Sequence, residues 1–134
     1  MKDHDKLLLR RKAAVHFGGR FVGGRFFMQK KKVDPFYKSI RWQNLRGRVL
    51  ARDGYQCQIS KRFGRDVLAN TVHHVFPREL YPQYQWQAWN LISLSHGEHN
   101  KMHIRNSHEL SEDGIKLLRR IAFKNNIPVP EEYQ

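Results

Sequence analysis

The chain has 134 residues, enough for one domain with an additional arm. It carries 25 Lys and Arg against 12 Asp and Glu, a formal net charge of +13, with a pI near 10.3. This balance favours a polyanionic partner, nucleic acid or an anionic membrane surface, over a charge that only keeps the protein soluble. A single cysteine, Cys57, excludes an internal disulfide framework. No apolar run reaches the roughly 20 residues that span a bilayer, so we expect a cytoplasmic protein without a signal peptide or membrane contact.

Residues 1–34 form the first predicted segment, a basic arm rich in Gly, Arg and Phe. Residues 1–33 hold ten Lys and Arg but two Asp, so a quarter of the chain carries a net charge of +8. Gly18-Gly19-Arg20-Phe21 returns as Gly23-Gly24-Arg25-Phe26, and glycine pairs disfavour regular structure. We expect a flexible arm that touches phosphates and bases, although a tail without a role fits equally well. The candidate nucleic-acid-binding residues of the arm are Arg20, Arg25, Lys30, Lys31 and Lys32.

The remaining residues, 35–134, are predicted to form one folded domain that begins with a helix. The helix is expected from Pro35 to Ala51 and ends at Asp53-Gly54. Its apolar face is predicted to contain Ile40, Trp42, Leu45, Val49 and Leu50. Four arginines, Arg41, Arg46, Arg48 and Arg52, lie mostly elsewhere on this helix and are interpreted as a solvated surface that could also touch phosphate.

A hairpin, two strands and two further helices follow in the predicted order. A polar hairpin runs through Lys61–Arg65, a strand covers about Leu68–Phe76, and the aromatic residues 80–88 form a loop. A second strand is expected around Leu91–Leu94. Ser95 and Glu98 have the spacing of a capping box, which would open a helix from about His96 to Arg105. The last helix is expected over residues 111–124, with Ile115, Leu118, Ile121 and Ala122 on one side and Asn125-Asn126 at its end.

Six of the eight histidines lie between His73 and His108. His99 and His103 are four residues apart, so on a helix both imidazoles could point at one ion. His73 and His74 are adjacent in a strand and should face opposite sides, so one could bind a metal while the other acts as a base. Three imidazoles leave open positions on a metal, as catalytic sites require. A fourth, unligated imidazole could take a proton from water near neutral pH.

Several of these residues also have alternative assignments. A structural zinc site is possible, but such sites usually recruit cysteines and the chain has one. His96 is the second choice for the ligand position given to His103, although it points away from the His99 face by helical geometry. His4, His16 and His108 are assigned no role. Arg78 and Lys101 lie near the histidines and are candidate phosphate contacts, or merely two basic residues among many.

With these residues in view, the chain resembles the HNH endonucleases, which have the ββα-metal (His-Me finger) fold. The resemblance covers about Phe36 to His103. Its lead-in, from Trp42 through Arg48-Val49-Leu50-Ala51-Arg52-Asp53-Gly54-Tyr55-Gln56-Cys57, is similar to stand-alone phage HNH proteins. The His-His pair, the Asn and the His-x-x-x-His motif are similar to those of colicin DNases. The resemblance implies an α+β fold, with a small ββα-metal core at residues 70–104 and flanking helices.

The resemblance also implies a role for each matched residue. His74 would be the general base that activates water, and Asn90 would hold the site loop and the base in position by hydrogen bonds. His73 and His99 would bind the metal. His103 would be the third ligand, as in the colicin-like variant, a position that many family members lack.

One departure from the family concerns a structural zinc, which many members hold with two Cys-x-x-Cys pairs. The matching positions here are Cys57, Ser60, Ser95 and Glu98, so three of four cysteines are missing. We therefore expect no structural zinc, and Ser95 and Glu98 should stabilise the helix start instead.

The function implied is hydrolysis of phosphodiester bonds in DNA, expected to be double-stranded, with one active site nicking one strand. The imidazole set suits Zn, Ni, Co or Mn, and the family commonly works with Mg or Mn, so one ion of these five is expected. A phage origin would place the protein in the host cytoplasm, with a terminase or another packaging protein as partner. A restriction or homing nuclease is an alternative within the enzyme class. A non-catalytic nucleic-acid-binding module on the same scaffold is the alternative outside it.

Overall fold

The structure, a computed structural model, describes residues 20–22, 25–27 and 32–134. The chain divides into two units, Met1–Asp34 and Pro35–Gln134. In the first unit, β1 (Arg20–Val22) and β2 (Arg25–Phe27) pair in antiparallel register, with Phe21 opposite Phe26. An arm without regular structure was expected. The short strands fit the aromatic and β-branched residues beside the Gly-Gly pair, because such residues favour extended pairing.

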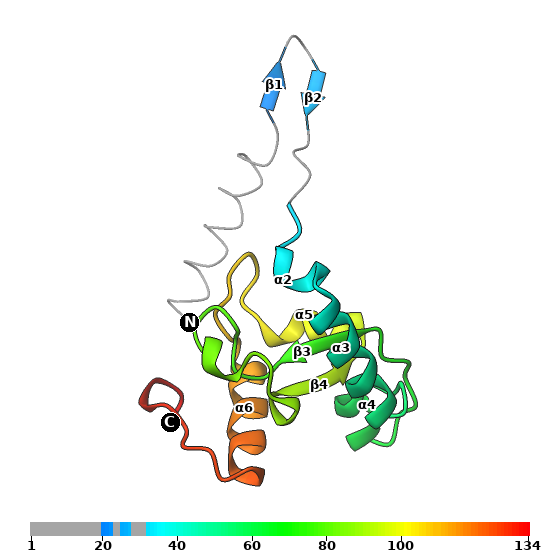
Figure 1. The fold of residues 1–134 in the computed structure, drawn as a ribbon. Coiled ribbons are helices and arrows are strands. Elements are labelled where there is room, and N and C mark those ends of the chain that lie inside the picture. Colours follow the sequence, from blue (N-terminus) through cyan, green and yellow to red (C-terminus); the bar gives the residue numbers. More distant parts are fainter. Residues whose placement is uncertain (1–19, 23–24, 28–31) are drawn as a thin grey trace. The chain divides into compact units, whose positions relative to one another are not determined.

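The second unit is built on two antiparallel strands and a helix. β3 (Thr71–His74) pairs with β4 (Leu91–Leu94), and α5 (His96–Met102) follows directly (Figure 1). α3 (Ile40–Arg52) and α5 each pack against both strands, and α6 (Glu112–Lys124) packs against α5. This arrangement confirms the predicted α+β fold with a ββα core and flanking helices.

Two apolar clusters hold the helices on the strands. The cluster under α3 contains the buried residues Trp42, Leu45, Val49, Leu50, Ala69, Val72 and Leu91. The cluster under α5 and α6 contains Cys57, Val75, Phe76, Ile92, Leu94, Met102, Leu110, Leu117, Leu118, Ala122 and Tyr133. Neighbouring residues of β4, Leu91 and Ile92, supply different clusters, because successive side chains of a strand point to opposite faces. The hairpin is therefore covered on both sides, and its histidines are buried.

The first predicted helix is interrupted. α2 (Pro35–Lys38) ends before Ser39, which has an extended backbone (ψ 145°) and starts α3 as its N-cap. The Ser39 hydroxyl accepts a hydrogen bond from the Trp42 N–H (3.2 Å) and donates one to the Phe36 carbonyl (2.7 Å). Such a serine caps a helix start better than it continues a helix. Ile40 is consequently 79% exposed and does not belong to the apolar face, which is a correction.

The expected polar hairpin is wrong. α4 (Gln58–Arg62) occupies its place, since the carbonyl of Cys57 accepts the first helical bond from the N–H of Lys61 (2.9 Å). A single antiparallel bridge between Gln56 and Leu68 is what remains of the expected pairing. The strand expected over Leu68–Phe76 is shortened to β3. The predicted loop 80–88 contains one short 3₁₀ turn, η1 (Pro82–Tyr84), and enters a second, η2 (Ala88–Asn90).

The two later helices begin where the sequence indicates. Ser95 and Ser111 are their N-caps, with hydroxyls that accept from the N–H groups of Glu98 and Gly114. Gly114 is required, because a Cβ there would lie 2.2 Å from the carbonyl oxygen of Met102. α6 can therefore cross the end of α5 closely. A last 3₁₀ turn, η3 (Glu131–Tyr133), closes the chain, and no helix of the described part is long and apolar enough to cross a bilayer.

Candidate active site

The histidine pair lies on β3 with its two imidazoles on opposite faces of the hairpin. His73 stands opposite Ile92 in the register, and His74 stands opposite Leu91. Ile92 belongs to the cluster under α5, whereas Leu91 belongs to the cluster under α3. Both histidines are buried, at 1% and 6% exposure. The strand geometry thus separates two adjacent residues into two environments.

On the α5 face, His73, His99 and His103 form one cluster of imidazoles. Their ring centroids lie 5.1–5.6 Å apart, and one nitrogen from each ring lies within 4.8 Å of the others. His99 is on α5, but His103 is not helical. It follows Met102 with an extended backbone (φ −118°, ψ 150°) and bridges Leu110. The prediction that this helix continues to Arg105 is therefore wrong. His103 reaches the cluster from the extended segment after α5.

All three imidazoles of this cluster are held neutral. Burial, together with the neighbouring imidazoles, lowers the pKa of His73 well below its ordinary value. Burial and the proximity of His103 lower the pKa of His99 to about 4, and burial also lowers the pKa of His103. A neutral imidazole has a nitrogen lone pair free for a cation, whereas an imidazolium does not.

Unpaired ring nitrogens also indicate that the cluster is available to a cation. Neither ring nitrogen of the buried His73, nor Nδ1 of His103, has a hydrogen-bond partner among the described residues. A buried polar atom without a partner costs about 1–3 kcal/mol, and a metal ion would satisfy it. The donor set therefore fits a divalent ion that accepts nitrogen ligands, and three protein ligands leave coordination positions open.

On the α3 face, His74 is enclosed by aromatic rings. Its ring stacks on Trp42 (centroids 5.1 Å, planes 20° apart) and also lies 5.7 Å from Phe36. Its Nε2 lies 3.1 Å from the carbonyl oxygen of Gln85. A carbonyl accepts hydrogen bonds, so the proton of the neutral ring belongs on Nε2 and the lone pair on Nδ1. Burial lowers the pKa of His74 to about 4.

Asn90 closes the loop that separates the two strands. Its Oδ1 accepts a hydrogen bond from the N–H of Phe76 (2.7 Å), while Nδ2 donates to the carbonyls of Phe76 and Tyr84 (each 3.2 Å). Asn90 is fully buried. Because Tyr84 precedes Gln85, the amide of Asn90 fixes the segment whose carbonyl faces His74. Asn90 does not belong to the imidazole cluster itself.

The predicted phosphate contacts are dispersed. Arg78 follows the histidine pair, with its guanidinium 4.3 Å above the Phe36 ring. Lys101 is on α5, 61% exposed, and pairs with Glu98 (3.2 Å). Lys32 is exposed. In the arm, Arg20 and Arg25 belong to β1 and β2, but Lys30 and Lys31, like His4 and His16, lie outside the described residues.

The remaining candidate histidines stay outside the cluster. His96, the second choice for a ligand, is exposed at the start of α5. His108 is exposed and lies 3.4 Å from the carboxylate of Glu79.

Three of the four positions that match the family's structural zinc ligands come together. Cys57 is fully buried, as is Ser60, and Ser95 is the α5 N-cap. Burial alone would raise the pKa of the Cys57 thiol, but hydrogen bonds with Ser60 and Ser95 outweigh it and lower that pKa. Polar contacts to a single sulfur thus link α4 to the start of α5.

Two features of the site have no clear sequence signal. The Gln85 carbonyl that faces His74 is a backbone group, which any residue type could supply. Trp42 was predicted as a core residue, and its periodicity was the only signal, although its indole also stacks on His74.

Comparison with known proteins finds a similar solved structure. It is the crystal structure of a deep-sea thermophilic bacteriophage GVE2 HNH endonuclease with manganese ion, 26% identical, with a TM-score of 0.48. The similarity covers 75% of this chain and 87% of that chain. No family model and no curated protein matches the sequence. Over the covered span, this chain is similar to the phage HNH endonuclease.

Proposed function

We propose that this protein is a metal-dependent endonuclease that hydrolyses phosphodiester bonds in DNA. One observation carries the proposal: three neutral imidazoles, one of them without any hydrogen-bond partner among the described residues, meet on one face of a hairpin. A fourth imidazole, that of His74, is fixed on the residue next to His73. A binding module needs basic residues, but it needs neither the cluster nor the separated base. The net charge of +13 supports a nucleic-acid substrate.

His73, His99 and His103 would hold one divalent ion. When bound, such an ion polarises a phosphoryl oxygen and stabilises the charge on the leaving oxygen. The chain itself supplies the geometry: His73 from β3, His99 from α5, and His103 from the segment after α5. Nitrogen ligands favour Zn, Ni, Co or Mn over Mg, which prefers oxygen ligands, but we keep Mg as a candidate.

His74 would act as the general base. With its proton on Nε2 toward the Gln85 carbonyl, Nδ1 can accept a proton from a water molecule. That water's oxygen bonds to phosphorus, the P–O3′ bond breaks, and the 3′ oxygen takes a proton from solvent. A pKa of about 4 is low for a base at neutral pH. A bound phosphodiester anion would raise it, because a nearby negative charge favours the imidazolium.

We further propose that the substrate is double-stranded DNA and that one site nicks one strand. The arm, Arg78 and Lys101 would add contacts to phosphates. A cytoplasmic location agrees with a single cysteine. A phage setting with a packaging or terminase partner stays a prediction from the sequence resemblance, as do the restriction and homing alternatives.

A supercoiled-plasmid assay tests the proposal. Purified protein is incubated with Mg²⁺, Mn²⁺, Ni²⁺, Co²⁺, Zn²⁺ or EDTA, and nicked and linear products are separated. We expect metal-dependent nicking that His74→Gln lowers by about 10²–10⁴-fold. His96→Ala is the matched control, since it removes an exposed histidine of α5 and should keep full activity.

Circular dichroism and a melting curve establish that His74→Gln is folded. Tight DNA binding without cleavage in any of the five metals would overturn the nuclease and favour the binding module. Equal cleavage by wild type and His74→Gln would remove His74 from the proposed role.

A further inference from the structure

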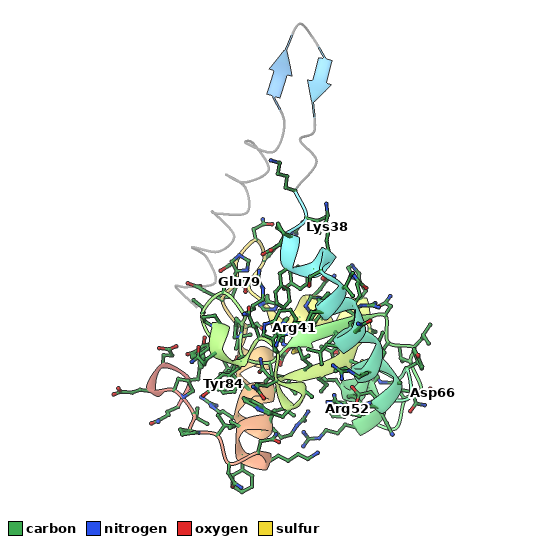
Figure 2. The ribbon with its side chains drawn as sticks, in the orientation of Figure 1. Lys38, Arg41, Arg52, Asp66, Glu79 and Tyr84 are labelled. Carbon is green, nitrogen blue, oxygen red and sulfur yellow. The ribbon has the colours of Figure 1, made fainter. Side chains whose placement is uncertain are left out.

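Four side chains beside His74 form a continuous stack that the proposed chemistry does not use. The guanidinium of Arg41, on α3, lies 4.0 Å above the ring of Trp86. Trp86 lies 4.6 Å from Phe36, and the guanidinium of Arg78 lies 4.3 Å above Phe36. The stack therefore runs from Arg41 through two rings to Arg78. Figure 2 labels Arg41 and Arg52, both on α3, and Glu79, which follows Arg78 in the sequence.

This stack borders the proposed base. Phe36, its central ring, is 5.7 Å from the ring of His74. Two rings, those of Phe36 and Trp86, thus lie between His74 and the Arg41 guanidinium. The stack joins two consecutive helices to a segment distant in sequence, since Phe36 comes from α2, Arg41 from α3 and Trp86 from the loop before β4. Arg41 is therefore held at a set place relative to the base.

The charge of Arg41 is available to a ligand. Within the described part of the chain, Arg41 makes no ion pair with a carboxylate, and its side chain is at the surface. By contrast, Arg52 on the same helix pairs with Asp53 and donates hydrogen bonds to the carbonyls of Ala88 and Leu91. Stacking on an indole leaves the N–H edges of a guanidinium free to donate. Those edges match the oxygens of a phosphodiester in geometry and charge.

We propose that Arg41, held over the ring of Trp86, binds a backbone phosphate of the DNA and positions the strand beside His74. The inference rests on the proposed nuclease function and adds a positioning residue to it. Trp86 serves as the platform that restricts Arg41, and it reduces the rotamer freedom that a free arginine would lose on binding. Arg41 contributes to substrate affinity and not to the chemical step.

Fluorescence anisotropy with a duplex oligonucleotide in EDTA tests this role, because binding is then measured without cleavage. We expect Arg41→Ala to weaken the affinity on the order of tenfold and to reduce the slope of log K against log salt by about 1. Arg41→Lys should recover the slope but only part of the affinity, since an ammonium keeps the charge without the planar stack. Arg48→Ala is the matched control, an exposed arginine two turns along α3.

Trp86→Leu tests the contribution of the Trp86 ring separately from that of the Arg41 charge. It should weaken binding less than Arg41→Ala and leave the salt slope unchanged; a melting curve confirms its fold. In the cleavage assay, Arg41→Ala should raise KM and leave kcat near wild type. An equal loss in Arg48→Ala, or no loss in Arg41→Ala, would overturn the role of Arg41. Wild-type affinity in Trp86→Leu would overturn the platform. If the nuclease proposal fails, no variant cleaves, yet the binding series still decides the role of Arg41.

Discussion

The two faces of the β3–β4 hairpin hold the same side chain in opposite surroundings. On one face, His73 meets two other imidazoles and no hydrogen-bond partner among the described residues. On the other, His74 lies against an indole ring and has a carbonyl acceptor for its ring proton. Burial lowers the pKa of both. Both rings are therefore neutral near pH 7, so one has a lone pair free for a cation and the other holds its lone pair in a fixed orientation.

Register is what keeps these two surroundings apart. A slip of one residue in a strand moves every side chain to the other face, so His73 and His74 would exchange places. Asn90 opposes such a slip, because its amide ties together both ends of the long connection between β3 and β4. The backbone bond from Val75 N–H to the Asn90 carbonyl (2.8 Å) extends the pairing beyond the named strands. Positions distant from the ion thus decide which histidine can bind it.

The largest expected effect comes from mutating the histidine on each face of the hairpin in turn. His73→Ala should abolish both metal binding and nicking, because it removes the buried ligand. His74→Gln should lose nicking yet bind the ion with near wild-type affinity, because its ring faces α3. Calorimetric titration with MnCl₂ measures the first property and the plasmid assay the second. Equal loss of Mn²⁺ binding in the two variants would show that the faces are not independent.

Asn90→Ala tests the side-chain hydrogen bonds that maintain the register. The change leaves the Phe76 N–H and two carbonyls without their partners, and each buried group costs about 1–3 kcal/mol. We expect the free energy of unfolding to fall by about 3 kcal/mol, measured by urea denaturation. Asn100→Ala, an exposed asparagine of α5, is the control and should change it by less than about 0.5 kcal/mol. A small loss in Asn90→Ala would mean that the loop is held by other contacts.

Much of this comparison is readable from the sequence, and the reasons are local. Alternation along a strand requires that adjacent histidines diverge, so the separation of His73 from His74 follows from period two. Serine at a helix start predicts Ser95 as a cap, because the hydroxyl satisfies a free N–H. The apolar spacing of α3 predicts Trp42, Leu45 and Val49 as buried, as the structure confirms.

The errors arise where a helix cap or a tertiary contact overrides the local apolar pattern. Ile40 has the spacing of a core residue, yet the cap at Ser39 begins a new helix and leaves it exposed. α4 forms where a hairpin was expected, next to the buried Cys57. His103 was placed on a helix that ends one residue earlier, at Met102. The stack of Arg41 on Trp86 joins segments 45 residues apart, which no local spacing reveals.

A smaller effect is expected when the imidazole cluster is protonated without metal. An unfolded histidine takes up a proton below about pH 6.5, whereas His99 in the fold does so only below about pH 4. Between these values the unfolded chain binds more protons, so stability falls as the pH decreases and is regained above about pH 6.5. Melting curves in EDTA at pH 7 and pH 5 should show the lower Tm at pH 5. The difference should shrink in His99→Asn, and an unchanged difference would assign the pH effect to other groups.

The smallest effect on the fold is expected from removing the metal at constant pH. Both apolar clusters close without a metal ligand, and the Cys57 thiol is already linked to Ser60 and Ser95 by hydrogen bonds. EDTA should therefore abolish nicking while the helical circular dichroism at 222 nm stays the same. A Tm increase on adding back the ion would reflect its binding to the folded state alone. A large loss of helical signal in EDTA would contradict this expectation, and it would indicate a metal that helps to hold the fold as well as the site.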